Sequence, residues 1–229
     1  MPAPDLIIFD CDGVLVDSEI VAARVEAELL REAGYEISPE EIAQRYSGLT
    51  FRDILMSIEK EAQMLFKASL IDHAEARTDE RLRKEVKAID GVARAVGALR
   101  TRKCICSNSS GERISAMLER TGLAPLFEGV IFSSLETPSR RPKPAPDVFL
   151  HAAGQMGADP ARTFVIEDSV HGIAGARAAG MRVIGFTGAS HSHANHANML
   201  MEAGAETTIH RMADLNRTIA ALSEWSEEV

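Results

Sequence analysis

The sequence predicts an α/β fold, in which a Rossmann-like parallel sheet core carries an inserted all-helical domain. Short apolar runs recur along the chain with amphipathic helical stretches between them. This alternation is typical of a mostly parallel sheet with helices on both faces. One long stretch breaks the alternation with helix signals alone. We therefore expect a core built from residues 1–16 and 88–229 and a helical cap over residues 17–87.

The expected strands are short and rich in Ile, Val, Leu and Phe, as strands buried on both faces are. They cover residues 6–10, 103–107, 129–133, 163–167, 182–186 and 207–210. Apolar residues at helical spacing between these strands predict helices that each present one face to the sheet. The helices cover residues 92–102, 111–121, 146–156, 172–179 and 212–223.

The stretch from residue 17 to residue 87 contains start and stop signals for several helices. Apolar residues at helical spacing begin at Val21 and stop at Gly34, a residue that ends helices. Ser38 precedes a proline and Glu41, which together form a capping box. A further helix opens at Thr50. An all-helical insert placed directly after the first strand would form a lid over the crevice of the sheet.

Composition and charge limit the partners of the chain. Its 229 residues carry a formal net charge of −9, which argues against a nucleic-acid partner, since that would need a basic face. No apolar run approaches the roughly 20 residues that span a bilayer. Cys11, Cys104 and Cys106 lie in or beside expected buried strands, which indicates reduced thiols. We expect a cytoplasmic protein that binds neither nucleic acid nor membrane, as a monomer or weak homodimer.

Two pairs of carboxylates follow two of the expected strands. Asp10 and Asp12 end the first strand, and Glu167 and Asp168 end the strand over residues 163–167. In an open α/β sheet the ligand crevice lies beyond the carboxyl ends of the strands, so both pairs are expected there. Carboxylates this close repel one another. A divalent cation would relieve the repulsion, and hard oxygen ligands suit Mg²⁺.

Groups that can bind phosphate follow two further segments. Ser107 and Asn108 come after the second strand and before a helix, where a hydroxyl and free backbone N–H groups can bind an anion. A serine in this position is also a common helix cap. Lys143 stands among prolines just before another expected helix, and the prolines stiffen the backbone that directs its side chain.

These four segments, in this order, resemble the four motifs of the haloacid dehalogenase-like superfamily, whose members are mostly magnesium-dependent phosphatases. The resemblance implies a HAD-like core with the helical cap of the β-phosphoglucomutase-like branch. It implies that Asp10 attacks phosphorus and that Asp12 first protonates the leaving alkoxide and then deprotonates water. It also implies that Ser107, Asn108 and Lys143 bind the transferring phosphoryl group.

The same resemblance implies Mg²⁺ as the cofactor. The metal would be held by the carboxylates of Asp10 and Asp168 and by the backbone carbonyl of Asp12. Glu167 would act directly or through water. Four negative charges against one lysine would repel a phosphate dianion, so we expect the metal to be obligatory for catalysis.

Other activities remain open at this stage. Phosphosugar mutases of the branch have a cap loop like Lys-Gly-Val-Ser-Arg and a histidine early in the first cap helix. Here the loop is Ser47-Gly-Leu-Thr50-Phe-Arg52, and Ala22 aligns with that histidine, so both differences favour a phosphatase. Phosphoglycolate hydrolysis and an inactive phosphometabolite-binding protein are further alternatives. Dehalogenases generally lack an acid at the position of Asp12.

The cap looks most like those of 6-phosphogluconate and other sugar-phosphate phosphatases. This implies a small phosphorylated metabolite as substrate, a sugar phosphate or a sugar-acid phosphate. We expect Glu19, Arg45, Thr50 and Arg52 to contact the leaving alcohol. An arginine in this set would suit the carboxylate of a sugar acid.

Three histidines follow the fifth expected strand. His191, His193 and His196 alternate with Ser, Ala and Asn, a composition that predicts an exposed and mobile loop. Three histidines also invite comparison with metal sites. The sequence leaves open whether this loop binds a metal.

Overall fold

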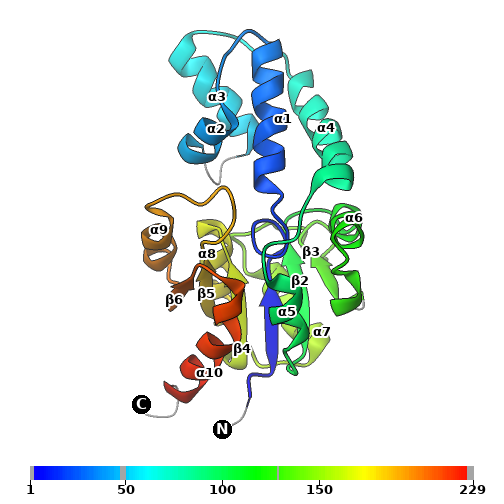
Figure 1. Cartoon of the computed structure of the whole chain (residues 1–229), viewed down its shortest axis with the longest axis vertical. Helices are drawn as coiled ribbons and strands as arrows, with labels where there is room; N and C mark the ends of the chain where they lie inside the picture. Colours follow the sequence, from blue (N-terminus) through cyan, green and yellow to red (C-terminus); the bar gives the residue numbers. More distant parts are fainter. Residues whose placement is uncertain (1–2, 47–49, 128, 226–229) are drawn as a thin grey trace.

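The structure, a computed structural model, describes residues 3–46, 50–127 and 129–225. Its core is a six-stranded parallel sheet in the order β3-β2-β1-β4-β5-β6 (Figure 1). The strands are β1 (Leu6–Phe9), β2 (Lys103–Ser107), β3 (Ile131–Ser133), β4 (Thr163–Glu167), β5 (Arg182–Phe186) and β6 (Thr207–Ile209). The expected α/β class with a parallel sheet is therefore confirmed.

Helices cover both faces of the sheet. Side chains alternate between the faces of a strand, so Ile7 and Phe9 belong to one buried cluster and Leu6 and Ile8 to another. The helices on the first face are α5 (Val92–Gly97), α6 (Gly111–Thr121) and α10 (Leu215–Trp225). The helices on the second face are α7 (Asp147–Met156), α8 (Val170–Ala178) and α9 (His196–Glu202).

A helical insert lies beyond the carboxyl ends of the strands (Figure 1). It consists of α1 (Glu19–Glu32), α2 (Pro39–Arg45), α3 (Phe51–Ala62) and α4 (Ser69–Glu85). Leu30, Ile42 and Ile58 form the centre of its own hydrophobic cluster, separate from the two clusters at the sheet. The helical region expected after the first strand is thus present. The domain boundaries at residues 17 and 87 stay a prediction.

Local capping explains where the helices of the insert begin. The Ser38 hydroxyl accepts a hydrogen bond from the Glu41 backbone N–H at 3.1 Å, at the start of α2. Thr50 and Asp53 form a reciprocal capping box at the start of α3. These bonds satisfy backbone donors that have no partner within the helix.

Several elements differ from their expected ranges, most clearly three helices. The helix expected to run to residue 102 ends at Gly97, a residue with poor helix propensity. Helix α4 (Ser69–Glu85) lies within the expected helical stretch, although no separate start was predicted for it. Helix α9 begins at His196, the last histidine of the expected loop, and was not predicted, because few of its residues, among them Leu200, are apolar and buried.

The three cysteines are free and buried, as expected for small apolar residues. Cys104 and Cys106 point to the same face of β2 and share one hydrophobic cluster. None of the described helices has the length and apolar character needed to cross a membrane.

Candidate active site

Three buried carboxylates meet at the carboxyl end of the sheet. Asp10 follows β1 directly, and Glu167 and Asp168 lie at the end of β4, the parallel strand paired with β1. Parallel pairing therefore brings together residues more than 150 positions apart. Each carboxylate offers one oxygen, and these oxygens all lie within 4.8 Å of one another.

Lys143 is the cation of this carboxylate cluster. Its Nζ donates to Oδ1 of Asp10 at 2.6 Å and to Oε1 of Glu167 at 2.7 Å. Burial by itself lowers the pKa of Lys143, but the two carboxylates outweigh it and raise the pKa above its usual value. Asn108 fixes the lysine backbone, because its Oδ1 accepts from the Lys143 N–H at 2.9 Å. Lys143 is thus held charged against the Asp10 carboxylate.

The negative charges of the cluster exceed what Lys143 offsets. Burial raises the pKa of Asp10 well above its ordinary value and also raises the pKa of Asp168. Excess buried carboxylate is what a divalent cation relieves, and oxygen donors are the ligands that hard cations prefer. The donor set therefore fits a divalent metal.

The hydrogen bonds indicate which carboxylate oxygens are available to a metal. Both oxygens of Glu167 have partners, since Oε1 accepts from Lys143 and Oε2 accepts from the N–H and hydroxyl of Ser169, both at 2.9 Å. Within the described residues, Oδ2 of Asp10 and Oδ1 of Asp168 accept no hydrogen bond. These two carboxylate oxygens are therefore the ones available to bind a metal.

Asp12 lies at the same edge of the sheet, where three hydroxyls hold its carboxylate. Ser18 donates to Oδ1 at 2.6 Å, while Ser107 and Ser109 donate to Oδ2 at 3.2 and 2.8 Å. The structure thus brings together Asp12 and Ser107, as the order of the strands required. Ser18 and Ser109 were missed by the sequence analysis, although both are hydroxyl residues that flank the recognised segments.

Two glycines make room for the carboxylates. A Cβ atom on Gly13 would lie 1.8 Å from Oδ2 of Asp168, and one on Gly172 would lie 1.7 Å from Oε1 of Glu167. Gly13 also adopts a φ of +76°, a conformation that L side chains rarely take. Neither position tolerates a side chain unless the acid beside it moves.

The loop after β5, here called the histidine loop (residues 190–196), closes over Asp168. His191 Nε2 lies 3.1 Å from Oδ2 of Asp168, and His196 Nε2 lies 2.7 Å from the Asp168 backbone carbonyl. The expectation of an exposed loop is wrong for these two histidines, because both contacts bury their rings. No pattern in the sequence indicated these contacts, because they join two segments that are far apart in the chain.

Among the described residues, the three histidines do not form a group suited to a metal. Both ring nitrogens of His196 have protein partners, Asp168 through Nε2 and Ser192 Oγ, 3.0 Å from Nδ1. The ring of His193 stacks on His196, with 5.4 Å between their centroids. In the part of the chain that the structure describes, the only group of side chains suited to a metal is the carboxylate cluster.

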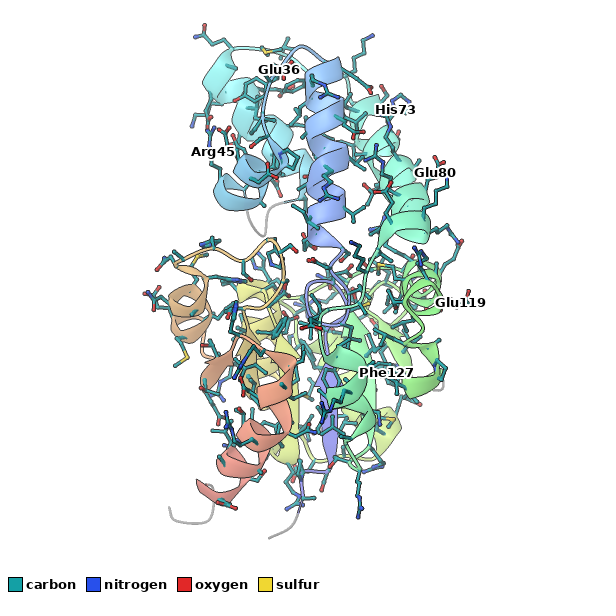
Figure 2. All side chains as sticks on the ribbon, viewed as in Figure 1. Glu36, Arg45, His73, Glu80, Glu119 and Phe127 are labelled. Atoms are coloured by element: carbon teal, nitrogen blue, oxygen red, sulfur yellow. The ribbon has the colours of Figure 1, made fainter. Side chains whose placement is uncertain are left out.

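Of the four expected specificity residues, Glu19 lies closest to the acids. It begins α1, where the insert meets the core. The residue is exposed at the surface, yet desolvation of its carboxyl by the surrounding protein, together with the charge of Asp12, raises the pKa of Glu19 to about 7. Arg45 pairs instead with Glu41 and Glu61 on the outer flank of the insert (Figure 2).

The two remaining candidates lie at the start of α3. The hydroxyl of Thr50 bonds to Asp53 in the capping box, so it serves the helix end. Arg52 is exposed. The residues 47–49 of the cap loop that precedes them lie outside the described residues.

Comparison with solved structures identifies two close relatives of the fold. One is a conserved haloacid dehalogenase-like protein of unknown function from Agrobacterium tumefaciens, with a TM-score of 0.92 and 56% identity, covering 96% of this chain and all of that one. The other is a HAD family hydrolase from Deinococcus radiodurans with bound phosphate and sodium. It has a TM-score of 0.83 and 35% identity, and the alignment covers 97% of both chains.

Comparison of sequences gives the same family. The 6-phosphogluconate phosphatase of Escherichia coli is 28% identical over 189 residues, which are 82% of this chain and 85% of that enzyme. The family model described as haloacid dehalogenase-like hydrolase matches residues 7–186, from β1 to β5. Because the matched region is most of the chain and contains every carboxylate described above, the protein belongs to the haloacid dehalogenase-like hydrolases.

Proposed function

We propose that this hydrolase is a Mg²⁺-dependent phosphatase of a small sugar phosphate or sugar-acid phosphate. The observation that carries the proposal is the buried cluster of Asp10, Glu167 and Asp168 with the Lys143 Nζ 2.6 Å from Asp10. The oxygens of the cluster would hold a cation, and its lysine faces the proposed nucleophile. This arrangement suits the positioning and charge compensation that phosphoryl transfer needs.

In the proposed reaction, a carboxylate oxygen of Asp10 forms a bond to phosphorus while the ester P–O bond breaks. Asp12 gives its proton to the departing alkoxide. It then takes a proton from the water that attacks the aspartyl phosphate, which releases inorganic phosphate and restores Asp10. The hydroxyls of Ser18 and Ser109 orient the Asp12 carboxyl for both transfers.

The remaining residues bind and position. Lys143 and Ser107 would neutralise and bind the phosphoryl oxygens, and Asn108 holds the lysine backbone in place and offers its own backbone N–H. Asp10, Asp168 and the backbone carbonyl of Asp12 would hold Mg²⁺, which supplies positive charge for the transferring group. Glu167 would act mainly through Lys143 or through water.

The helical insert would cover the phosphoester during the reaction, as a cap over residues 17–87. The closed cap would exclude water while Asp10 attacks phosphorus, and the cap would reopen to release the product. The similarity to a 6-phosphogluconate phosphatase supports a sugar-like leaving alcohol, and the phosphate in the Deinococcus radiodurans relative supports a phosphorylated substrate.

Phosphate release from a panel of phosphomonoesters tests the proposal. The panel contains sugar phosphates, sugar-acid phosphates, phosphoglycolate, nucleotides and p-nitrophenyl phosphate, each with and without Mg²⁺. We expect release from a sugar-type compound, lost with Asp10→Asn and lost on chelation. Asp72→Asn, the same change at an exposed position of α4, is the matched control and keeps full activity.

Three results would contradict the proposal. Activity that persists after exhaustive chelation would remove the metal from the mechanism. Activity that persists in Asp10→Asn would remove the nucleophile. Isomerisation of β-glucose 1-phosphate without phosphate release would identify a mutase instead.

A further inference from the structure

A cavity of about 270 Å³ lies between the core and the helical insert. The core side is formed by residues 190–193 of the histidine loop. The insert side is formed by Ile20 of α1 and by Glu40 and Ala43 of α2. Ligand pockets commonly span roughly 300–1,000 Å³, so this cavity lies just below that range and has room only for a small group. None of the specificity residues expected from the sequence lines it in the described structure.

The cavity adjoins the carboxylate cluster through one shared residue. His191 forms part of the cavity wall, and its Nε2 lies 3.1 Å from Oδ2 of Asp168. The His191 ring is the contact between the two, so the alcohol of a phosphomonoester held at Asp10 would pass beside this ring to reach the cavity. On the proposed reaction, the cavity is the neighbouring space that could receive the leaving group.

The polar groups of the wall suit hydroxyl ligands. The Ser190 hydroxyl donates to Asp17, and the Ser192 hydroxyl lies 3.0 Å from Nδ1 of His196. Both hydroxyls are thus fixed in direction and keep lone pairs that can accept a further hydrogen bond. The ring of His193 adds a nitrogen that donates or accepts according to its tautomer. A hydroxyl group both donates and accepts, so a polyhydroxylated ligand satisfies such a wall.

The charges around the cavity disfavour an acidic ligand. No lysine or arginine lines it among the described residues. Glu40 contributes a carboxylate that has no ion-pair partner in the described structure, and His191 already faces the carboxylate of Asp168. A carboxylate on the leaving group would thus add a like charge beside existing ones.

We propose that this cavity binds the leaving alcohol of a neutral polyhydroxylated phosphomonoester, the phosphate of a sugar alcohol or uncharged sugar, in preference to that of a sugar acid. The inference rests on the proposed phosphatase function and narrows its substrate class. It assigns the recognition of the leaving group to residues 190–193 and to Glu40, which interact with it from the core and from the insert.

Two substrates of the same carbon skeleton test this inference. Glucitol 6-phosphate and 6-phosphogluconate differ only at the carbon farthest from the phosphate, which is an alcohol in one and a carboxylate in the other. With the 229-residue chain and saturating Mg²⁺, we expect kcat/KM to be at least about tenfold higher for glucitol 6-phosphate. Hydrolysis of p-nitrophenyl phosphate measures phosphoryl transfer independently of which sugar-type leaving group the protein prefers.

A charge reversal at Glu40 tests whether the cavity makes the selection. Glu40→Lys should shift the ratio of the two kcat/KM values at least about fivefold toward 6-phosphogluconate. Glu36→Lys makes the same charge change at the end of the insert remote from the sheet (Figure 2) and should leave the ratio unchanged.

The outcomes separate the inference from the function on which it rests. Preference of the wild-type protein for 6-phosphogluconate, or an equal shift in both lysine variants, would overturn the inference and leave the phosphatase standing. The inference would also be overturned if the protein hydrolysed only phosphomonoesters that are not sugar or sugar-alcohol phosphates. Failure to hydrolyse any compound, p-nitrophenyl phosphate included, would refute the phosphatase function, and the inference with it.

Discussion

His191 Nε2 lies 3.1 Å from Oδ2 of Asp168, and both side chains are at least nine-tenths buried. A carboxylate only accepts hydrogen bonds, so Nε2 carries the hydrogen that joins them. The contact leaves Oδ1 of Asp168 open and fixes its direction. His191 is therefore a positioning residue for the carboxylate that we propose as a metal ligand.

Replacing His191 should weaken metal binding. Partners that orient a metal ligand typically contribute about 10–100-fold to metal affinity, so His191→Ala should raise the Mg²⁺ concentration needed for half-maximal effect by that factor. Thermal stabilisation of the protein by Mg²⁺ measures this without relying on turnover. His191→Asn, which keeps a donor, should recover part of the affinity, whereas the exposed His171→Ala should leave it unchanged. An unaltered Mg²⁺ titration in His191→Ala would refute the positioning role.

The close approach at Gly13 predicts a loss of activity out of proportion to the loss of stability. Gly13→Ala would force Asp168 to move, and misplacement of a reacting group by about 1 Å costs on the order of a hundredfold in rate. Gly34→Ala is the matched control, because Gly34 also has a positive φ, +91°, but has no atom within 4 Å of an added Cβ. Both variants should lose about 1–2 kcal/mol of unfolding free energy from backbone strain. Only Gly13→Ala should lose phosphate release, and equal activity in the two would show that Asp168 tolerates displacement.

The elements of the sheet could be predicted from the sequence because each is an apolar run with a sharp polar end. The strands Lys103–Ser107, Thr163–Glu167 and Arg182–Phe186 begin and end where expected. Asp10 and Glu167 could be placed together for the same reason, since parallel strands put their carboxyl ends at one edge of the sheet. A short apolar run with polar ends has few other places in a fold than a buried strand, so the predicted and observed strands agree.

Contacts between loops could not be predicted, because no periodic pattern records them. The bond from His191 to Asp168 depends on the path of residues 187–195, which local sequence leaves undefined. Arg45 was expected to contact the substrate. Its side chain instead pairs with Glu61, which lies 16 residues away on a different helix and could not be identified as its partner from local sequence. Specificity residues are therefore the part of the site that sequence reasoning defines least.

The burial of Lys143 predicts a large stability cost for its removal. Its side chain is 3% exposed and bonds to both Asp10 and Glu167, so Lys143→Ala would leave two buried carboxylates without their cation. Breaking a buried pair in this way costs about 3–5 kcal/mol. Denaturant unfolding of the metal-free protein measures it.

An exposed ion pair on α4 is the matched control for that measurement. Lys84 bonds to Glu80 at 2.6 Å, a similar distance, but both side chains are 66% exposed. Exposed pairs contribute about 0–1 kcal/mol, so Lys84→Ala should hardly change the free energy of unfolding. If the two lysine variants unfold at the same denaturant concentration, the buried network does not stabilise the fold.

The carboxyl of Glu26 predicts that the metal-free protein is more stable at mildly acidic pH than at pH 8. Glu26 lies partly buried on α1 and has no hydrogen-bond or ion-pair partner in the described structure. Burial, with a smaller contribution from Glu19, raises the pKa of Glu26 from 4.5 to about 7. Between these two values the folded state binds the proton more tightly than the unfolded state, so the free energy of unfolding falls as pH rises through that window.

Substitution of Glu26 isolates this effect. A tenfold change in proton affinity is about 1.4 kcal/mol, so the contribution of Glu26 has an upper limit of roughly 3 kcal/mol. Glu26→Gln cannot ionise, and its free energy of unfolding should exceed that of the wild type at pH 8 and converge with it near pH 4.5. Denaturant unfolding at a series of pH values gives both curves, and the exposed Glu36→Gln should follow the wild type throughout. Parallel curves for Glu26→Gln and the wild type would mean that Glu26 stays ionised in the fold at neutral pH.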